Sequence, residues 1–153
     1  ILRARETAET INQKHQLPIQ LEPALKEIEY GEWIGKTFHE VRSDPNYNPY
    51  FRDEHAPVGV TGESLRQVCD RGVQFIESLR KEELVGKIAL VSHADWIKCI
   101  LLHYLEKPLS HLYQLRIDNA SISYLLFEKN TARVIAVNAA TTIESLLLPR
   151  GPL

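Results

Sequence analysis

A histidine directly follows a short apolar segment, in a position that suits phosphate chemistry. Residues 88–91 are apolar on both faces and partly β-branched, which predicts a strand buried on both sides that ends at Ser92-His93. A helix is expected from Asp95, so its free N–H groups and positive dipole end would face an anion there. An imidazole at this point can hydrogen-bond a phosphate and titrates near neutral pH. The residues alone leave open that His93 only caps the helix.

Two arginines stand near the start of another predicted helix, at residues 2–15. Arg3 and Arg5 could cradle a phosphate through charge-assisted hydrogen bonds. Arginines on a helix are usually solvated, and the pattern by itself favours this second interpretation.

Three acids share one short stretch with two aromatic residues. Glu27, Glu29 and Glu32 lie close to Tyr30 and Trp33. A carboxyl group held against an apolar wall has a raised pKa and can act as a general acid. A solvated edge of the protein would show the same residue types, so the stretch does not by itself select an acid.

Apolar spacing and cap residues predict the elements that would position these groups. Expected helices cover residues 2–15, with one buried side, and 37–42, 64–79 and 95–105. Expected strands cover residues 19–21, 88–91, 121–128 and 132–137, the last two as a hairpin. Strands that alternate with helices indicate a single α/β domain, layered with helices on both faces of a sheet. The tail beyond Glu144 is expected to fray.

Residues 44–62 form a long loop rich in proline, glycine and asparagine. Its aromatic residues, Tyr47, Tyr50 and Phe51, predict a packed flap. Together with Arg52 they suggest a pocket for a substrate with an apolar part, although ordinary packing of the flap would explain them equally well.

Composition excludes several classes of protein. The 153 residues are 44% hydrophobic and 25% charged, with a net charge of −2, so a general binder of nucleic acid or anionic membrane is not expected. No apolar run approaches the roughly 20 residues that span a bilayer, and no signal peptide is expected. Cys69 and Cys99 fall in apolar helical patterns, which predicts reduced core residues in a compartment such as the cytoplasm. Histidine and cysteine spacing predicts no metal site.

Five segments, in order, resemble motifs of the histidine phosphatase superfamily, the phosphoglycerate mutase-like proteins. The motifs are R-A-x-x-T-A, L-x-E followed by G-x-W-x-G, G-E-S, V-S-H and N-A-S-I. In this sequence they begin at Arg3, Leu25, Gly62, Val91 and Asn119. Each motif alone is weak, but their common order covers almost the whole chain. The resemblance implies a three-layer sandwich with a mostly parallel central sheet.

The resemblance also implies roles for particular residues. Arg3 would bind the phosphoryl group, and His93 would hydrogen-bond it and stabilise the pentacoordinate transition state. Glu27 would protonate the leaving alkoxide, and the backbone N–H of Ala94, which stands where the family usually has glycine, would also bind the phosphoryl group. No cofactor is implied.

One family motif has no counterpart here. The family's first strand ends in R-H-G, whose histidine becomes phosphorylated, and none of the six histidines lies between an arginine and a glycine. We therefore expect residues 1–153 to be a single but N-terminally incomplete domain. Without the missing strand, residues 88–91 would expose an apolar edge, so the isolated chain is not expected to be a stable monomer.

The expected function is hydrolysis of a small phosphorylated metabolite through a phosphohistidine. A cofactor-dependent phosphoglycerate mutase is an alternative, although the 35 positions between Glu27 and Gly62 are too few for the long insertion of those mutases. A second alternative is a non-catalytic module that binds a phosphorylated ligand or a partner. The chain as given would be inactive without its nucleophile. Nucleic acid and membrane are not expected partners, and assembly into a homo-oligomer stays open.

Overall fold

The computed structural model describes residues 1–82, 86–128 and 131–139. The predicted fraying of the tail beyond Glu144 lies outside these residues. Within them, no helix is long and apolar enough to cross a bilayer.

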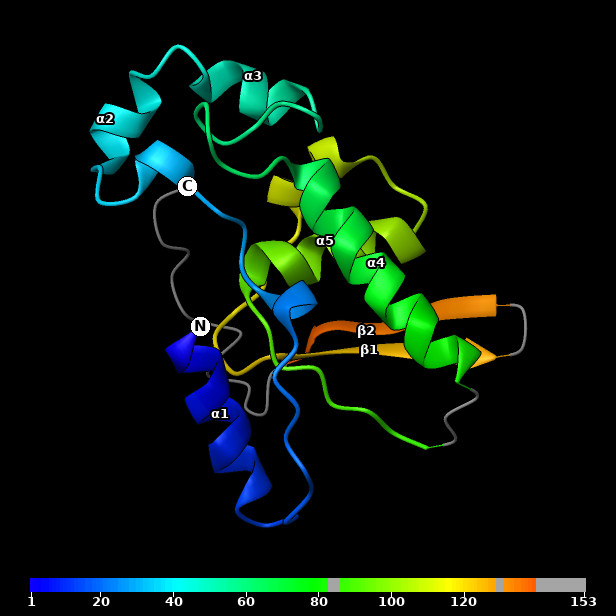
Figure 1. The fold of residues 1–153 in the computed structure, drawn as a ribbon. Coiled ribbons are helices and arrows are strands. Elements are labelled where there is room, and N and C mark those ends of the chain that lie inside the picture. The colour runs from blue at the N-terminus through cyan, green and yellow to red at the C-terminus, as the bar shows by residue number, and fades with distance from the viewer. Residues whose placement is uncertain (83–85, 129–130, 140–153) are drawn as a thin grey trace.

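Two helices form the centre of the molecule. α4 (Leu65–Lys81) crosses α5 (Ala94–Tyr104), as Figure 1 shows. The helices approach closely because Gly72 has no side chain: an added Cβ would lie 2.6 Å from Cδ1 of Ile100 and 2.8 Å from Nε1 of Trp96. Cys69 and Cys99 are free and buried, as predicted. This crossing fixes the start of α5, where His93 lies.

Local sequence signals define the start of two of the predicted helices. Ser64 caps α4 and Thr37 caps α2 (Phe38–Arg42), and each forms a capping box with the third helical residue, Gln67 or Glu40. The first predicted helix is α1 (Leu2–Asn12). Its expected buried side is wrong, because no residue of α1 is buried and Leu2 is 67% exposed.

The predicted flap is packed, and it contains a helix that the sequence did not indicate. α3 (Tyr47–Arg52) places the ring of Phe51 against those of Tyr47 and Tyr50, and both tyrosines against Trp33. Tyr50 is 2% exposed, and the ring of Phe51 lies 4.7 Å from that of Tyr113. These aromatic residues therefore serve the core, which favours packing over a substrate pocket.

The predicted hairpin is confirmed. β1 (Ile122–Glu128) pairs antiparallel with β2 (Thr131–Ala139), from Ile122 opposite Ala139 to Glu128 opposite Thr131. Leu125 and Phe127 pack against the core. The hairpin itself lies beside the central helices (Figure 1). These two strands are the one sheet formed by the described residues.

Two predicted strands are not formed. Residues 19–21 and 88–91 have no assigned strand structure, and Ile19 and Ile88 are 41% and 54% exposed. The prediction that residues 88–91 are buried on both sides is therefore wrong for these residues. A strand needs a partner for its N–H and C=O groups, and no described residue provides one. The expected exposure of an apolar edge is observed at Ile88.

Candidate active site

Glu27 lies in irregular backbone between two short 3-10 helices. These are η1 (Pro23–Leu25) and η2 (Gly31–Trp33). Its side chain is partly buried and lines a cavity of about 770 Å³ together with Arg3, Tyr30 and Trp33. Gly31 turns the chain at the cavity rim with a φ of +51°, where a Cβ would also meet Thr61 and Gly62. The structure therefore brings two predicted site residues, Arg3 and Glu27, to one cavity.

The three acids of this stretch have different surroundings. Burial, followed by the negative charge of Asp95, raises the pKa of Glu27. The pKa of Glu29 is lowered because its carboxylate accepts a 2.6 Å hydrogen bond from Lys26. Hydrogen bonds from the hydroxyl and N–H of Thr61 and from the N–H of Val60 lower the pKa of Glu32 to about 2.

Only Glu27 of the three is therefore suited to hold a proton. Backbone N–H groups of Ile28 and Trp96 and the charge of Arg3 favour its ionised form, but burial outweighs them. Glu32 instead fastens η2 to the end of the flap through its bonds to residues 60 and 61. The residue types alone did not separate these two roles.

His93 precedes the first residue of α5 and does not cap the helix with its side chain. Its carbonyl accepts the N–H of Ile97 at 2.9 Å, while the imidazole makes no capping hydrogen bond. His93 is 6% exposed, and burial, followed by the charge of Arg3, lowers the pKa of its imidazole. A neutral imidazole therefore stands at the helix N-terminus near pH 7, next to the partly buried Ala94.

Arg3 links the cavity to the start of α5. It is exposed on α1, and its positive charge acts on the pKa of both Glu27 and His93. The structure thus places Arg3 within electrostatic reach of the other two predicted residues. Arg5 differs, because it pairs with Glu9 at 2.7 Å on the exposed face of the helix. The solvated interpretation therefore holds for Arg5.

Sequence reasoning gave no role to a polar group beside Glu27. The Tyr30 hydroxyl donates to Oδ2 of Asp95 at 3.2 Å, and Lys98 approaches Oδ1 at 3.2 Å. Burial, followed by the charges of Asp95 and Glu27, raises the pKa of Tyr30. The only sequence signal was the Asp95 position at a helix start. Tyr30 and Asp95 are 65 residues apart, so no local pattern shows their contact.

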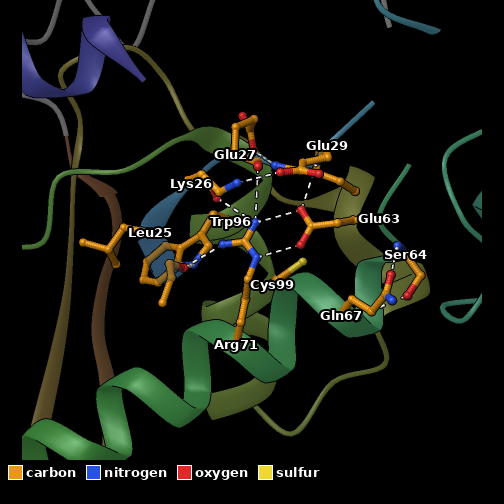
Figure 2. A network of polar contacts seen from close by, with 12 residues as sticks. Leu25, Lys26, Glu27, Glu29, Glu63, Ser64, Gln67, Arg71, Trp96 and Cys99 are labelled. Atoms are coloured by element: carbon orange, nitrogen blue, oxygen red, sulfur yellow. Dashed lines mark hydrogen bonds and ion pairs between the residues drawn. The ribbon is translucent and has the colours of Figure 1, made fainter. Parts of the chain in front are cut away.

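A second unassigned group holds the backbone on either side of Glu27. Figure 2 shows Arg71 of α4 between the carboxylate of Glu63 and the carbonyl groups around Glu27. Trp96 donates its indole N–H to the carbonyl of Ala24 at 2.6 Å. The cavity wall is therefore fastened to both central helices.

Comparison with known proteins identifies the family. The model of the histidine phosphatase superfamily (branch 1) matches residues 1–140. The chain belongs to the histidine phosphatase superfamily. Among relatives in this superfamily, the Escherichia coli adenosylcobalamin/alpha-ribazole phosphatase is 23% identical over 139 residues, which is 90% of this chain and 68% of that protein. Phosphoserine phosphatase 1 of Hydrogenobacter thermophilus is 28% identical over 90% of this chain and 64% of its own length.

Solved structures of the superfamily agree with this assignment. Phosphoserine phosphatase from Entamoeba histolytica, in complex with 3-phosphoglyceric acid, matches with a TM-score of 0.81 and 28% identity. The match covers 91% of this chain and 70% of the amoebal chain. The fold is therefore an α/β fold of phosphatases, and the named relatives act on phosphorylated compounds.

Proposed function

We propose that the protein is a phosphomonoesterase that hydrolyses a small phosphorylated metabolite through a phosphohistidine. Arg3 and His93 bind the phosphoryl group, assisted by the N–H of Ala94 at the start of α5. Glu27 is the general acid. The observation that carries the proposal is a contrast among three neighbouring acids. Glu27 lines one cavity with Arg3, and of the three acids it alone has a raised pKa.

The chemistry has two steps. A nucleophilic histidine outside these 153 residues attacks phosphorus, the P–O bond breaks, and the leaving oxygen takes the proton of Glu27. Water then attacks the phosphohistidine, Glu27 takes a proton from that water, and the P–N bond breaks to release phosphate. Arg3, the neutral imidazole of His93 and the helix N-terminus offset the charge on the equatorial oxygens.

We further propose that residues 1–153 form one domain, completed by a preceding segment of the same polypeptide. That segment would pair with residues 88–91, build the parallel sheet of a three-layer sandwich and supply the nucleophile. The 54% exposure of Ile88 supports the pairing. An intact mass of the natural gene product well above 17.5 kDa is expected. A mass equal to that of these residues would refute this part of the proposal.

The test of function is the hydrolysis of p-nitrophenyl phosphate and β-glycerophosphate by the full-length protein. His93→Ala should lower kcat about a hundredfold or more on both substrates, because one stabilising contact to the transition state is lost. His103→Ala is the matched control, since His103 is exposed in the last turn of the same helix. Equal activity of the His93 and His103 variants would refute the role of His93.

Glu27→Gln separates the acid from the binding residues. It should slow β-glycerophosphate hydrolysis far more than p-nitrophenyl phosphate hydrolysis, because nitrophenolate leaves without a proton. Equal losses on both substrates would mean that Glu27 is not the acid.

The same protein tests the two alternatives. Interconversion of phosphoglycerates that 2,3-bisphosphoglycerate stimulates would favour a mutase. Phosphate binding without turnover would favour a non-catalytic module.

A further inference from the structure

The loop that carries Glu27 is held by side chains from distant elements. We call residues 24–29 the acid loop. Four consecutive carbonyl groups of this loop, those of residues 24–27, accept hydrogen bonds from side chains. Arg71 donates to the carbonyls of residues 24, 26 and 27 at 2.6, 2.8 and 3.2 Å. Ser92 donates to the carbonyl of residue 25 at 2.8 Å. Regular backbone pairing therefore does not fix this part of the loop.

Arg71 is itself fixed by a carboxylate. Its Nε lies 2.9 Å from Oε1 of Glu63 and its Nη2 lies 3.0 Å from Oε2, a two-point contact in which both side chains are 20% exposed. Such a planar pair allows one relative orientation of the two groups. Since Arg71 lies in α4 and Glu63 immediately precedes the Ser64 cap, the pair is anchored to the central helix.

Glu63 also holds the far end of the acid loop. Its Oε2 accepts the N–H of Glu29 at 3.0 Å, and its own N–H donates to the carbonyl of Glu29 at 2.8 Å. The Arg71–Glu63 pair thus contacts the loop on both sides of Glu27, at residues 24, 26 and 27 and at residue 29 (Figure 2). Movement of the pair would move the backbone from which the Glu27 carboxyl group projects.

We propose that Arg71 and Glu63 are positioning residues for Glu27. Together they hold the acid loop so that the Glu27 carboxyl group meets the leaving oxygen of the substrate. This inference rests on the proposed role of Glu27 as general acid. A misplacement of about 1 Å at a reacting group costs about a hundredfold in rate. The contacts need the planar fork of arginine, because one guanidinium serves three carbonyl groups and both carboxylate oxygens. A lysine keeps the charge but not this geometry.

The test compares Arg71→Lys with Arg66→Lys in the full-length protein. Arg66 lies on the same helix and also pairs with a carboxylate, that of Glu54 in the flap. Among the described residues it makes no hydrogen bond to the acid loop. Arg71→Lys should lower kcat for β-glycerophosphate about ten- to hundredfold. It should change kcat for p-nitrophenyl phosphate less than about threefold, because that leaving group needs no acid. Arg66→Lys should affect both substrates equally and weakly.

A double variant decides whether the effect passes through Glu27. In a Glu27→Gln background, Arg71→Lys should cause no further selective loss on β-glycerophosphate, because the group that it positions is already removed. Glu63→Gln should show the same substrate selectivity and provides a second variant if Arg71→Lys does not fold, which thermal melting reports.

Two outcomes would overturn the inference while leaving the phosphatase proposal intact. These are equal losses of Arg71→Lys on both substrates, and an additive loss in the Glu27→Gln background. Absence of turnover by the unaltered full-length protein, or a Glu27→Gln variant without substrate selectivity, would instead overturn the acid role and with it this inference.

Discussion

The two sides of this molecule differ in the exposure of their large apolar side chains. Around α4 and α5 the large apolar side chains are buried, and Val68, Cys99 and Leu112 are fully enclosed. On the side of α1, large apolar side chains face outward: Leu2 is 67% exposed and Leu21 69%. The candidate active site lies between these sides, since Glu27 is fastened to α4 and α5 whereas Arg3 stands on α1. The Glu27 half of the site is thus held by the core, whereas the Arg3 half lies on a helix that has no buried residue.

The largest expected effect of this difference is on the thermal stability of the isolated 153-residue chain. The isolated 153-residue chain should show no cooperative thermal transition as a monomer, because its α1 side exposes apolar surface and residues 88–91 lack a strand partner. The full-length protein should melt cooperatively. Calorimetry combined with ultracentrifugation of both proteins measures this. A sharp thermal transition of the isolated chain as a monomer would contradict the prediction that its α1 side needs a further partner for stability.

Among single substitutions, one that opens a cavity in the packed side should lower the free energy of unfolding the most. Leu102 on α5 is 2% exposed and belongs to the core. In the full-length protein, Leu102→Ala should lower the free energy of unfolding by about 2–5 kcal/mol, through lost burial and a cavity. Urea denaturation measures the change, and Gln74→Ala, an exposed position on α4, is the control. A loss as small as that of the control would contradict the assignment of this core.

A substitution on the exposed side shows whether that side is covered in the full-length protein. Ile88→Ala should lower the free energy of unfolding by about 2 kcal/mol there, because we expect a strand to cover this residue. Val60, which is 67% exposed at the end of the flap, is the control, and Val60→Ala should change the free energy of unfolding by less than about 0.5 kcal/mol. If both variants lose equally little free energy of unfolding, Ile88 is exposed to solvent in the full-length protein and the proposed strand is absent.

The smallest effects concern pH, and they should differ in sign between two neighbouring acids. Folding raises the pKa of Glu27 above 4.5, so the folded state binds more protons than the unfolded state. The contribution of Glu27 to stability therefore falls as pH rises above 4.5. Folding lowers the pKa of Glu32 to about 2, so its contribution is present above about pH 4.5 and falls as pH decreases.

The two variants are compared from pH 2 to pH 8. Glu27→Gln should gain stability relative to the unaltered protein as pH rises above about 4.5, whereas Glu32→Gln should lose stability relative to it as pH rises from about 2 to 4.5. Urea denaturation of the full-length protein across this range measures both differences. The same sign for both variants would contradict the distinction between an acid that holds a proton and one that holds the flap.

The sequence predicted the elements whose signals are local. The capping residues Thr37 and Ser64 mark where α2 and α4 begin, because each side chain bonds an N–H three residues later. The hairpin was predictable because its two strands are adjacent in the chain. Residues 19–21 and 88–91 misled the prediction, since an apolar, β-branched segment becomes a strand only where a partner pairs with it.

For the site, the order of the motifs in the sequence indicated the family and the positions of the candidate residues. The contacts in the structure showed how the surroundings of these residues differ. Arg3, Glu27 and His93 stand in motifs that a sequence can show, and the family match supports that resemblance. In the sequence, only the motif resemblance separates Glu27 from Glu32. The difference between their pKa values depends on burial and on charges from other elements, which spacing does not show. The hydrogen bonds of Arg71 to residues 24, 26 and 27 join positions more than 40 apart, and only the packing of α4 beside the acid loop decides them.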